Sequence, residues 1–141
     1  MSKHKFSNIL LTGAAGALGN QLRETLSKEC DSLKISDKVN LEKKFHNEKV
    51  EIADLASTES ILKLTKDIDC IVHMGGQSIE GSWDNVLNSN IIGMYNLYEA
   101  CRKNKIKRVI WASSVHTVGF YSRSEVIAVS YTHLRAHETE A

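Results

Sequence analysis

The sequence predicts an α/β fold in which a mostly parallel sheet carries helices on both faces. Three observations support this prediction. Short apolar runs alternate with segments of helical periodicity along the 141 residues, a glycine-rich turn follows the first run, and an acid ends the second. Parallel strands in one sheet are joined by right-handed crossovers, so this alternation indicates a doubly wound sheet. The length leaves room for one domain.

The turn after the first run, Thr12–Gly19, predicts a phosphate-binding site of the Rossmann type. It follows an apolar strand and opens an expected helix over 16–29. Gly13 lets the chain leave the strand sharply, Gly16 removes a Cβ that would keep a pyrophosphate away, and Gly19 lets the helix lie close to the strand. The N–H groups at the start of the helix then face the phosphates.

The acid that ends the second strand is Asp37, which lies 18 residues after Gly19 and directly after the expected strand 33–36. A carboxylate at this point accepts hydrogen bonds from the hydroxyls of an adenosine ribose. A solvated turn acid is the alternative. Lys38 would suit a 2′-phosphate, but the acid favours NAD over NADP. The polar residues 39–48 are expected to form a surface connection.

Three further strands are expected. The strand 50–55 ends in Asp54-Leu55, where the acid either approaches the adenine or caps the loop. The strand 69–76 stops in a glycine pair, and two glycines at a strand's C-terminal end permit a close approach of backbone to ligand. His73 in this strand is interpreted as a packed residue rather than a catalytic base. The last clear strand is 108–114.

Ser57 and Ser82 are the expected N-caps of two helices, the second of which runs over 83–104. Gly93 within this helix indicates close packing, because glycine there costs about 1 kcal/mol relative to alanine. Asn90 either hydrogen-bonds a neighbouring strand or faces solvent. Apolar residues recur mainly at three- and four-residue steps, so we expect this stripe to lie in the core: Val86, Leu87, Ile91, Met94, Tyr95, Tyr98 and Cys101.

The charge balance, 18 basic against 17 acidic residues, gives no indication of nucleic acid or an anionic membrane as a partner. No apolar run is long enough to span a membrane, and the N-terminus leads into a strand rather than a signal peptide. We therefore expect a soluble, cytoplasmic protein. Cys30, Cys70 and Cys101 are far apart and form no CxxC, which favours buried structural thiols over a disulfide framework or a metal site.

Five segments together resemble the extended short-chain dehydrogenase/reductase superfamily of NAD-dependent epimerases and dehydratases: Thr12–Gly19, Asp37, Asp54-Leu55, His73–Ser78, and Ser113-Ser114 with Gly119. Within it, residues 71–78 and 112–121 resemble the uronate dehydrogenases. The resemblance extends over about residues 6–122, the N-terminal half of such an enzyme. It implies that a hexuronic acid, such as galacturonate or glucuronate, is oxidised at its anomeric carbon to an aldarolactone with hydride transfer to NAD.

The resemblance also implies roles by position. The residues implied to contact the cofactor are Gly13, Gly16, Ala17, Leu18 and Gly19 at the pyrophosphate, Asp37 at the ribose, Asp54 and Leu55 at the adenine, and Met74, Gly75, Gly76 and Gln77 at its middle. Ser78, Ser114 and His116 are implied to reach the sugar, and Ser114 to pair with a catalytic tyrosine. Val115 stands where the family usually has asparagine, a departure that concerns the substrate rather than the cofactor.

The family's proton acceptor is the tyrosine of a Tyr-x-x-x-Lys pair. Here Tyr131 is followed four residues later by Arg135, but residues 129–139 resemble the translation of a transposon-based sequencing-library adapter. We therefore expect 1–128 to be an incomplete NAD-binding portion, truncated after about the fifth strand, and 129–141 to be a non-native tail. On this interpretation the chain lacks the catalytic pair and activity, whereas weak NAD binding persists.

Two alternatives stay open for the parent protein. One is a nucleotide-sugar epimerase or dehydratase of the same superfamily. The other is a cofactor-sensing NAD-binding module that does no chemistry. A small-molecule sugar acid is the expected substrate, and a homo-oligomeric parent is left open.

Overall fold

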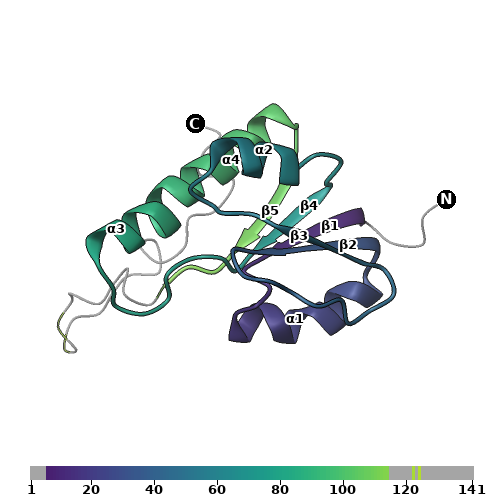
Figure 1. Cartoon of the computed structure of the whole chain (residues 1–141), viewed down its shortest axis with the longest axis horizontal. Coiled ribbons are helices and arrows are strands. Elements are labelled where there is room, and N and C mark those ends of the chain that lie inside the picture. Colours follow the sequence, from purple (N-terminus) through teal and green to yellow (C-terminus); the bar gives the residue numbers. More distant parts are fainter. Residues whose placement is uncertain (1–5, 115–121, 123, 125–141) are drawn as a thin grey trace. The chain divides into compact units, whose positions relative to one another are not determined.

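A parallel five-stranded sheet forms the centre of the computed structural model, which describes residues 6–114, 122 and 124. The strands lie in the order β3-β2-β1-β4-β5 (Figure 1). Their bounds are Phe6–Thr12 for β1, Cys30–Asp37 for β2, Glu48–Ile52 for β3, Cys70–His73 for β4 and Arg108–Trp111 for β5. The order reverses between β1 and β4, which is the switch point where ligands bind in sheets of this kind.

Helices cover both faces of the sheet, as the sequence predicts. Helix α1, Ala17–Lys28, lies on one face, and α2, Thr58–Leu64, lies on the other beside one long continuous helix (Figure 1). The long helix consists of α3, Trp83–Val86, a π-helical segment η1, Leu87–Ile92, and α4, Gly93–Lys103. The predicted doubly wound α/β fold is therefore confirmed.

The core has two layers because side chains alternate across a strand. Ile9 and Leu11 of β1 face α1, whereas Leu10 between them packs with Ile61 of α2 and Leu97 of α4. All five side chains are buried. The two core layers thus fix α1 on one face of the sheet and the long helix on the other.

Both predicted serine caps are present. The hydroxyl of Ser57 accepts from the N–H of Ser60, and that of Ser82 accepts from the N–H of Asn85, each at 3.3 Å. The three cysteines are buried and free, as expected. Burial raises the pKa of Cys101 to about 11, so this thiol stays protonated at neutral pH.

Residues 39–47 of the connection before β3 are exposed or half-exposed, as predicted for a surface segment, but the last residue assigned to that segment, Glu48, is not. Glu48 begins β3 and is buried, and its carboxylate accepts from Arg23 Nε at 2.7 Å and from the N–H of Lys44 at 2.7 Å. Burial acts to raise the pKa of Glu48, but the hydrogen bonds from Arg23 and the backbone outweigh it and hold the pKa below its ordinary value. Burial of a charge is tolerated here because the charge is paired.

The expected core stripe of the long helix is wrong for its middle part. Ile91, Tyr95 and Tyr98 are 51%, 67% and 44% exposed, and Leu97 and Ala100 are buried instead. These two sets of residues lie on opposite faces of the long helix, about half a turn apart. Leu97 and Ala100 pack in the core layer that also contains Leu10 of β1.

Gly93 confirms the close packing expected there. A Cβ at this position would lie 2.8 Å from Leu55 Cβ and 3.2 Å from the carbonyl oxygen of Asn88. The long helix is thereby held directly against the loop that follows β3.

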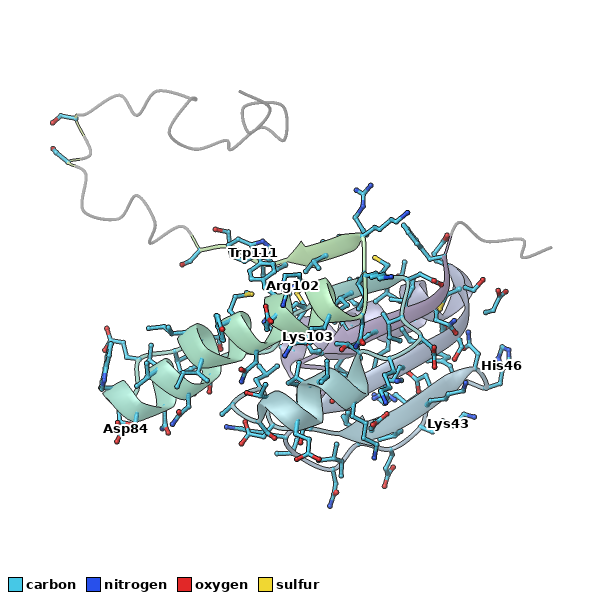
Figure 2. All side chains as sticks on the ribbon, turned by 90° about the horizontal axis from the view of Figure 1, so that it is seen from above. Lys43, His46, Asp84, Arg102, Lys103 and Trp111 are labelled. Carbon is cyan, nitrogen blue, oxygen red and sulfur yellow. The ribbon has the colours of Figure 1, made fainter. Side chains whose placement is uncertain are left out.

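Strand β5 is an edge strand of the sheet, and Ile110 and Trp111 on it are each about half exposed. Figure 2 labels Trp111. The chain divides into two units, Met1–Trp111 and Ala112–Ala141. The segment expected to be a non-native tail, 129–141, lies outside the described residues. Within the part that is described, no helix is long and apolar enough to cross a membrane.

Candidate dinucleotide-binding site

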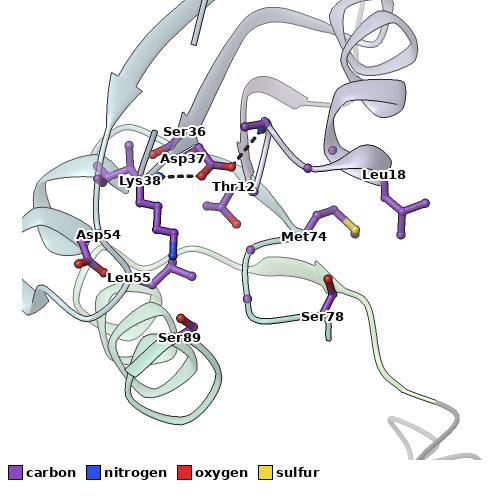
Figure 3. A pocket seen from close by; sticks show the side chains of 18 of the residues that line it. Thr12, Leu18, Ser36, Asp37, Lys38, Asp54, Leu55, Met74, Ser78 and Ser89 are labelled. Atoms are coloured by element: carbon purple, nitrogen blue, oxygen red, sulfur yellow. Dashed lines mark hydrogen bonds between the residues drawn. The ribbon is translucent and has the colours of Figure 1, made fainter. Parts of the chain in front are cut away.

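A cleft of about 400 Å³ opens at the C-terminal edge of the sheet, between the β1–α1 turn and the ends of β2, β3 and β4 (Figure 3). It lies at the switch point of the strand order. Most residues that the sequence singles out for the cofactor line it: Gly13, Gly16, Ala17, Leu18, Gly19, Asp37, Asp54, Leu55, Met74, Gly75 and Gly76. The cleft is large enough to enclose part of a dinucleotide.

Two positions of the turn between β1 and α1 have room only for glycine. Gly13 has a φ of +69°, and a Cβ there would overlap the backbone of Met74 and Gly75. A Cβ at Gly19 would fall on the carbonyl group of Gly13. The β1–α1 turn therefore lies against the turn after β4, and α1 begins close to β1.

Helix α1 presents an uncapped N-terminus to the cleft. Its N-cap is Gly16, which supplies no side-chain hydrogen bond, and no acid lies in the first turn. The N–H groups and the positive end of the helix dipole are therefore available to a bound anion. Leu18, the second residue of α1, is 61% exposed and lines the cleft.

Asp37 ties the end of β2 to the glycine turn. Its Oδ2 accepts from the N–H of Ala15 at 3.0 Å, and its Oδ1 accepts from the N–H of Lys38 at 2.8 Å (Figure 3). Each carboxylate oxygen retains acceptor capacity, which is the chemistry that a ribose diol requires. Asp54 Oδ1 accepts from the N–H of Ala56 at 2.9 Å, so its loop-capping role is observed and its contact with adenine stays a prediction.

The cleft has two sides. Asp37, Lys38, Asp54 and Leu55 lie on one side, and Met74 lies on the other with Ser78 (Figure 3). Because β3, β2, β1 and β4 are adjacent in that order, the glycine turn and the start of α1 lie between the two sides. An extended ligand with a central anionic group would fit this arrangement.

Gln77 is the one residue of the predicted cofactor set that does not line the cleft. Its backbone is held by Asn90, whose Oδ1 accepts from Gln77 N–H at 2.7 Å and whose Nδ2 donates to the Gln77 carbonyl at 3.0 Å. Of the two alternatives left open for Asn90, the structure therefore supports contact with a neighbouring element, here the turn after β4.

His73 is packed beneath the cleft, which confirms its interpretation as a packed residue. It is 3% exposed, and its Nδ1 lies 2.6 Å from Thr12 Oγ1. Burial lowers the pKa of His73 to about 4, so the ring is neutral near pH 7. Its contact with Thr12, which lines the cleft, joins the ends of β1 and β4.

Several lining residues were not singled out as cofactor contacts by the sequence, although Thr12 and Ala15 belong to the predicted glycine turn and Lys38 was weighed for a 2′-phosphate: Thr12, Ala15, Ser36, Lys38, Ala53, Ile61, Leu64 and Ser89. Most lie next to assigned positions, and Ile61 and Leu64 contribute from the buried face of α2. Ser89 had no sequence signal, because the π-helical segment that carries it follows from no simple periodicity.

Two residues predicted to reach the sugar are not placed at this cleft. Ser114 follows β5 and belongs to the second unit of the chain. His116 lies outside the described residues. Ser78, the third, lines the cleft.

The parallel sheet, the glycine turn and the acid at the end of β2 define an α/β protein of the dinucleotide-binding class. The profile of the NAD dependent epimerase/dehydratase family matches residues 9–138, and the chain belongs to this family. The match includes part of the segment 129–141, whose non-native origin stays a prediction.

Among curated relatives, a uronate dehydrogenase of Pseudomonas syringae is 42% identical over 123 residues, and that alignment covers 86% of this chain and 45% of the relative. A uronate dehydrogenase of Agrobacterium fabrum is 41% identical, with 83% and 44% covered. A solved mutant of the Agrobacterium tumefaciens uronate dehydrogenase complexed with NAD has a TM-score of 0.82 at 40% identity, with 86% and 46% covered. The chain spans about half the length of the curated relatives it matches.

Proposed function

We propose that this chain is the NAD-binding N-terminal part of a dehydrogenase that oxidises a hexuronic acid, galacturonate or glucuronate, at C1 to an aldarolactone. The observation that carries the proposal is the cleft at the switch point, with the uncapped start of α1 at its centre and Asp37 beside it. The likeness to uronate dehydrogenases over 86% of the chain supports the substrate class.

The residues of the cleft fit an NAD molecule laid across the strand ends. In this arrangement the first turn of α1 holds the pyrophosphate with Gly16, Ala17 and Leu18, and Asp37 accepts from the ribose hydroxyls. Asp54 and Leu55 border the adenine, and Met74 to Gly76 border the half beyond the pyrophosphate. NAD supplies the hydride acceptor when it is bound.

NAD is favoured over NADP for an electrostatic reason. A 2′-phosphate on the adenosine ribose would lie against the Asp37 carboxylate, which already accepts two backbone hydrogen bonds and carries a negative charge. Lys38 lies on the same side of the cleft and offsets this repulsion only in part.

The sugar is proposed to bind beyond the β4 end of the cleft, where Ser78 lies. Ser114 and His116 are proposed to complete that site, and Ser114 to pair with the catalytic tyrosine. Bound NAD would accept the hydride from C1, and a base would take the proton of the C1 hydroxyl, which together would oxidise the sugar. The proposed base, a tyrosine of a Tyr-x-x-x-Lys pair, is expected beyond residue 128.

A nucleotide-sugar enzyme of the same family is the second candidate. A solved structure described as MoeE5 in complex with UDP-glucuronic acid and NAD has a TM-score of 0.69 to this chain at 25% identity. A binding module that does no chemistry is a third possibility, and it would bind NAD without turnover.

The first test concerns the gene. Sequencing the source DNA downstream of the codon for Ala128 should reveal a Tyr-x-x-x-Lys pair in place of residues 129–141. The protein translated from that longer reading frame should form NADH with galacturonate or glucuronate, and the 141-residue chain should not. NADH formation or epimerised product only with a nucleotide-linked sugar would favour the second candidate, and NAD binding without turnover on any sugar would favour the third.

A further inference from the structure

The long helix contacts both sides of the cleft through two asparagines. Asn90 in η1 makes two hydrogen bonds to the backbone of Gln77, in the turn after β4. Asn96 in α4 is buried, and its Nδ2 donates to the carbonyl oxygen of Leu55 at 2.9 Å, in the turn after β3. Two turns from different strands are thereby fixed to one helix.

The π-helical segment accounts for the position of Asn90. A π-turn inserts an extra residue into a helix and changes which side chains face a neighbour, and such segments are frequent at functional sites. In η1 the segment places Ser89 on the cleft and Asn90 on Gln77. A regular α-helix of the same sequence would rotate these two residues relative to the residues that pack on the sheet.

The turn held by Asn90 is closely confined. Gly76 has a φ of +150°, and a Cβ there would lie 2.8 Å from Asn90 Oδ1. A Cβ at Gly75 would lie 3.0 Å from Leu55 Cδ1 and 3.5 Å from Gly13 N. The position of this wall of the cleft therefore depends on Asn90 from one direction and on the glycine turn from another.

The turn held by Asn96 is fixed independently. Thr58 Oγ1 donates to Asn96 Oδ1 at 2.9 Å, so both ends of the amide are used. This places Leu55 and its neighbour Asp54 on the side of the cleft opposite Met74 and Ser78 (Figure 3).

We propose that Asn90 and Asn96 are positioning residues for different halves of one dinucleotide. Asn90 sets the wall for the half beyond the pyrophosphate, and Asn96 sets the wall for the adenosine half. The inference rests on the proposed function, since it assumes that NAD lies across the cleft. It predicts that substitution of Asn90 weakens the binding of NAD but not of AMP, which contains the adenosine half alone. Substitution of Asn96 should weaken the binding of both ligands.

The test is a calorimetric titration of the 141-residue chain with NAD and with AMP. Asn90→Ala should raise the Kd for NAD about tenfold and that for AMP less than about twofold, as expected for the loss of two modest hydrogen bonds. Asn96→Ala should raise both constants by a similar factor. Asn88→Ala, an exposed asparagine two residues before Asn90, is the matched control and should change neither.

Gly76→Ala provides a second route to the same turn. It should weaken the binding of NAD and leave the binding of AMP unchanged, as expected for Asn90→Ala. The combined variant should lose less binding free energy than the sum of the two single losses, because the added Cβ meets Asn90.

Equal losses of NAD and AMP affinity in Asn90→Ala, or no loss of either, would overturn the inference. The inference would also be overturned if the unsubstituted chain bound NAD no more tightly than it binds AMP. An unsubstituted chain that binds neither ligand would overturn the proposed function itself, and this inference with it.

Discussion

The guanidinium of Arg23 and the carboxylate of Glu48 form an ion pair that is closed to solvent. Nε lies 2.7 Å from Oε1, and the two side chains are 3% and 0% exposed. Arg23 Nη2 also donates to the carbonyl oxygen of Glu42 at 2.6 Å, and Glu48 accepts from the N–H of Phe45 at 3.1 Å. The pair thus attaches the connection between β2 and β3 to α1, the helix that presents its N-terminus to the cleft.

Removal of one partner should therefore destabilise the fold strongly. Arg23→Ala is expected to lower the free energy of unfolding by about 3–5 kcal/mol, because it leaves a buried carboxylate without its counter-charge. Chemical denaturation monitored by circular dichroism measures this loss. The matched control is Glu24→Ala, which removes an exposed pair with Lys28 and should leave stability nearly unchanged. Equal stability of the two variants would contradict the role of the buried pair.

His73 should make stability depend on pH. Its pKa is about 4 in the folded chain against an ordinary value of 6.5, so the unfolded chain binds the proton more readily. The stabilisation is present above about pH 6.5 and is lost as the pH falls toward 4, by about 3 kcal/mol in total. Denaturation midpoints across this range measure it. In His73→Asn, which cannot titrate, the loss over the same range should be much smaller, and an unchanged profile would refute the assignment.

The glycine turn should not tolerate a single methyl group at Gly19. Gly19→Ala would drive its Cβ into the Gly13 carbonyl, so α1 must move away from β1. We expect a loss of about 1–3 kcal/mol in stability and a loss of NAD binding. Gly81→Ala is the matched control, because the nearest atom there is Gln77 Nε2 at 3.2 Å, the end of a flexible side chain. Thermal melts with and without NAD compare the two, and retained NAD binding in Gly19→Ala would argue against the turn as the phosphate site.

Discrimination between NAD and NADP should depend on Asp37. Asp37→Ser removes the charge that opposes a 2′-phosphate and leaves Lys38 in place. The dissociation constant for NADP divided by that for NAD should fall by about tenfold or more, because NAD loses a hydrogen-bonded carboxylate and NADP loses a repulsive charge. A ratio that does not change would place the selectivity elsewhere in the cleft.

The sequence predicted the features of this protein that follow from local rules. The positions of Gly13 and Gly19 follow from the steric needs of one tight turn, and Asp37 follows from where the next strand ends. The Ser57 and Ser82 caps are likewise set within a few residues. These features were correct because each depends on neighbours in the chain.

Other features depend on partners far along the chain and could not be predicted. Glu48 was assigned to a polar surface segment because its partner, Arg23, lies on another element, and nothing in either residue's neighbours indicates the pairing. The exposed face with Ile91 and Tyr95 was assigned to the core because its spacing is that of a buried stripe. The face that packs on the core carries Leu97 and Ala100 instead, and the spacing of apolar residues alone does not show which of two apolar faces of a helix is buried.

The central claim is that the cleft binds NAD through the start of α1 and Asp37. The most direct measurement is a calorimetric titration of the 141-residue chain with NAD, carried out on the unsubstituted chain, on Asp37→Ala, and on Asp31→Ala as an exposed acid at the other end of the same strand. We expect binding that Asp31→Ala leaves intact and that Asp37→Ala weakens about tenfold to a hundredfold. Binding that is absent in the folded chain, or equally weakened by both substitutions, would contradict the claim.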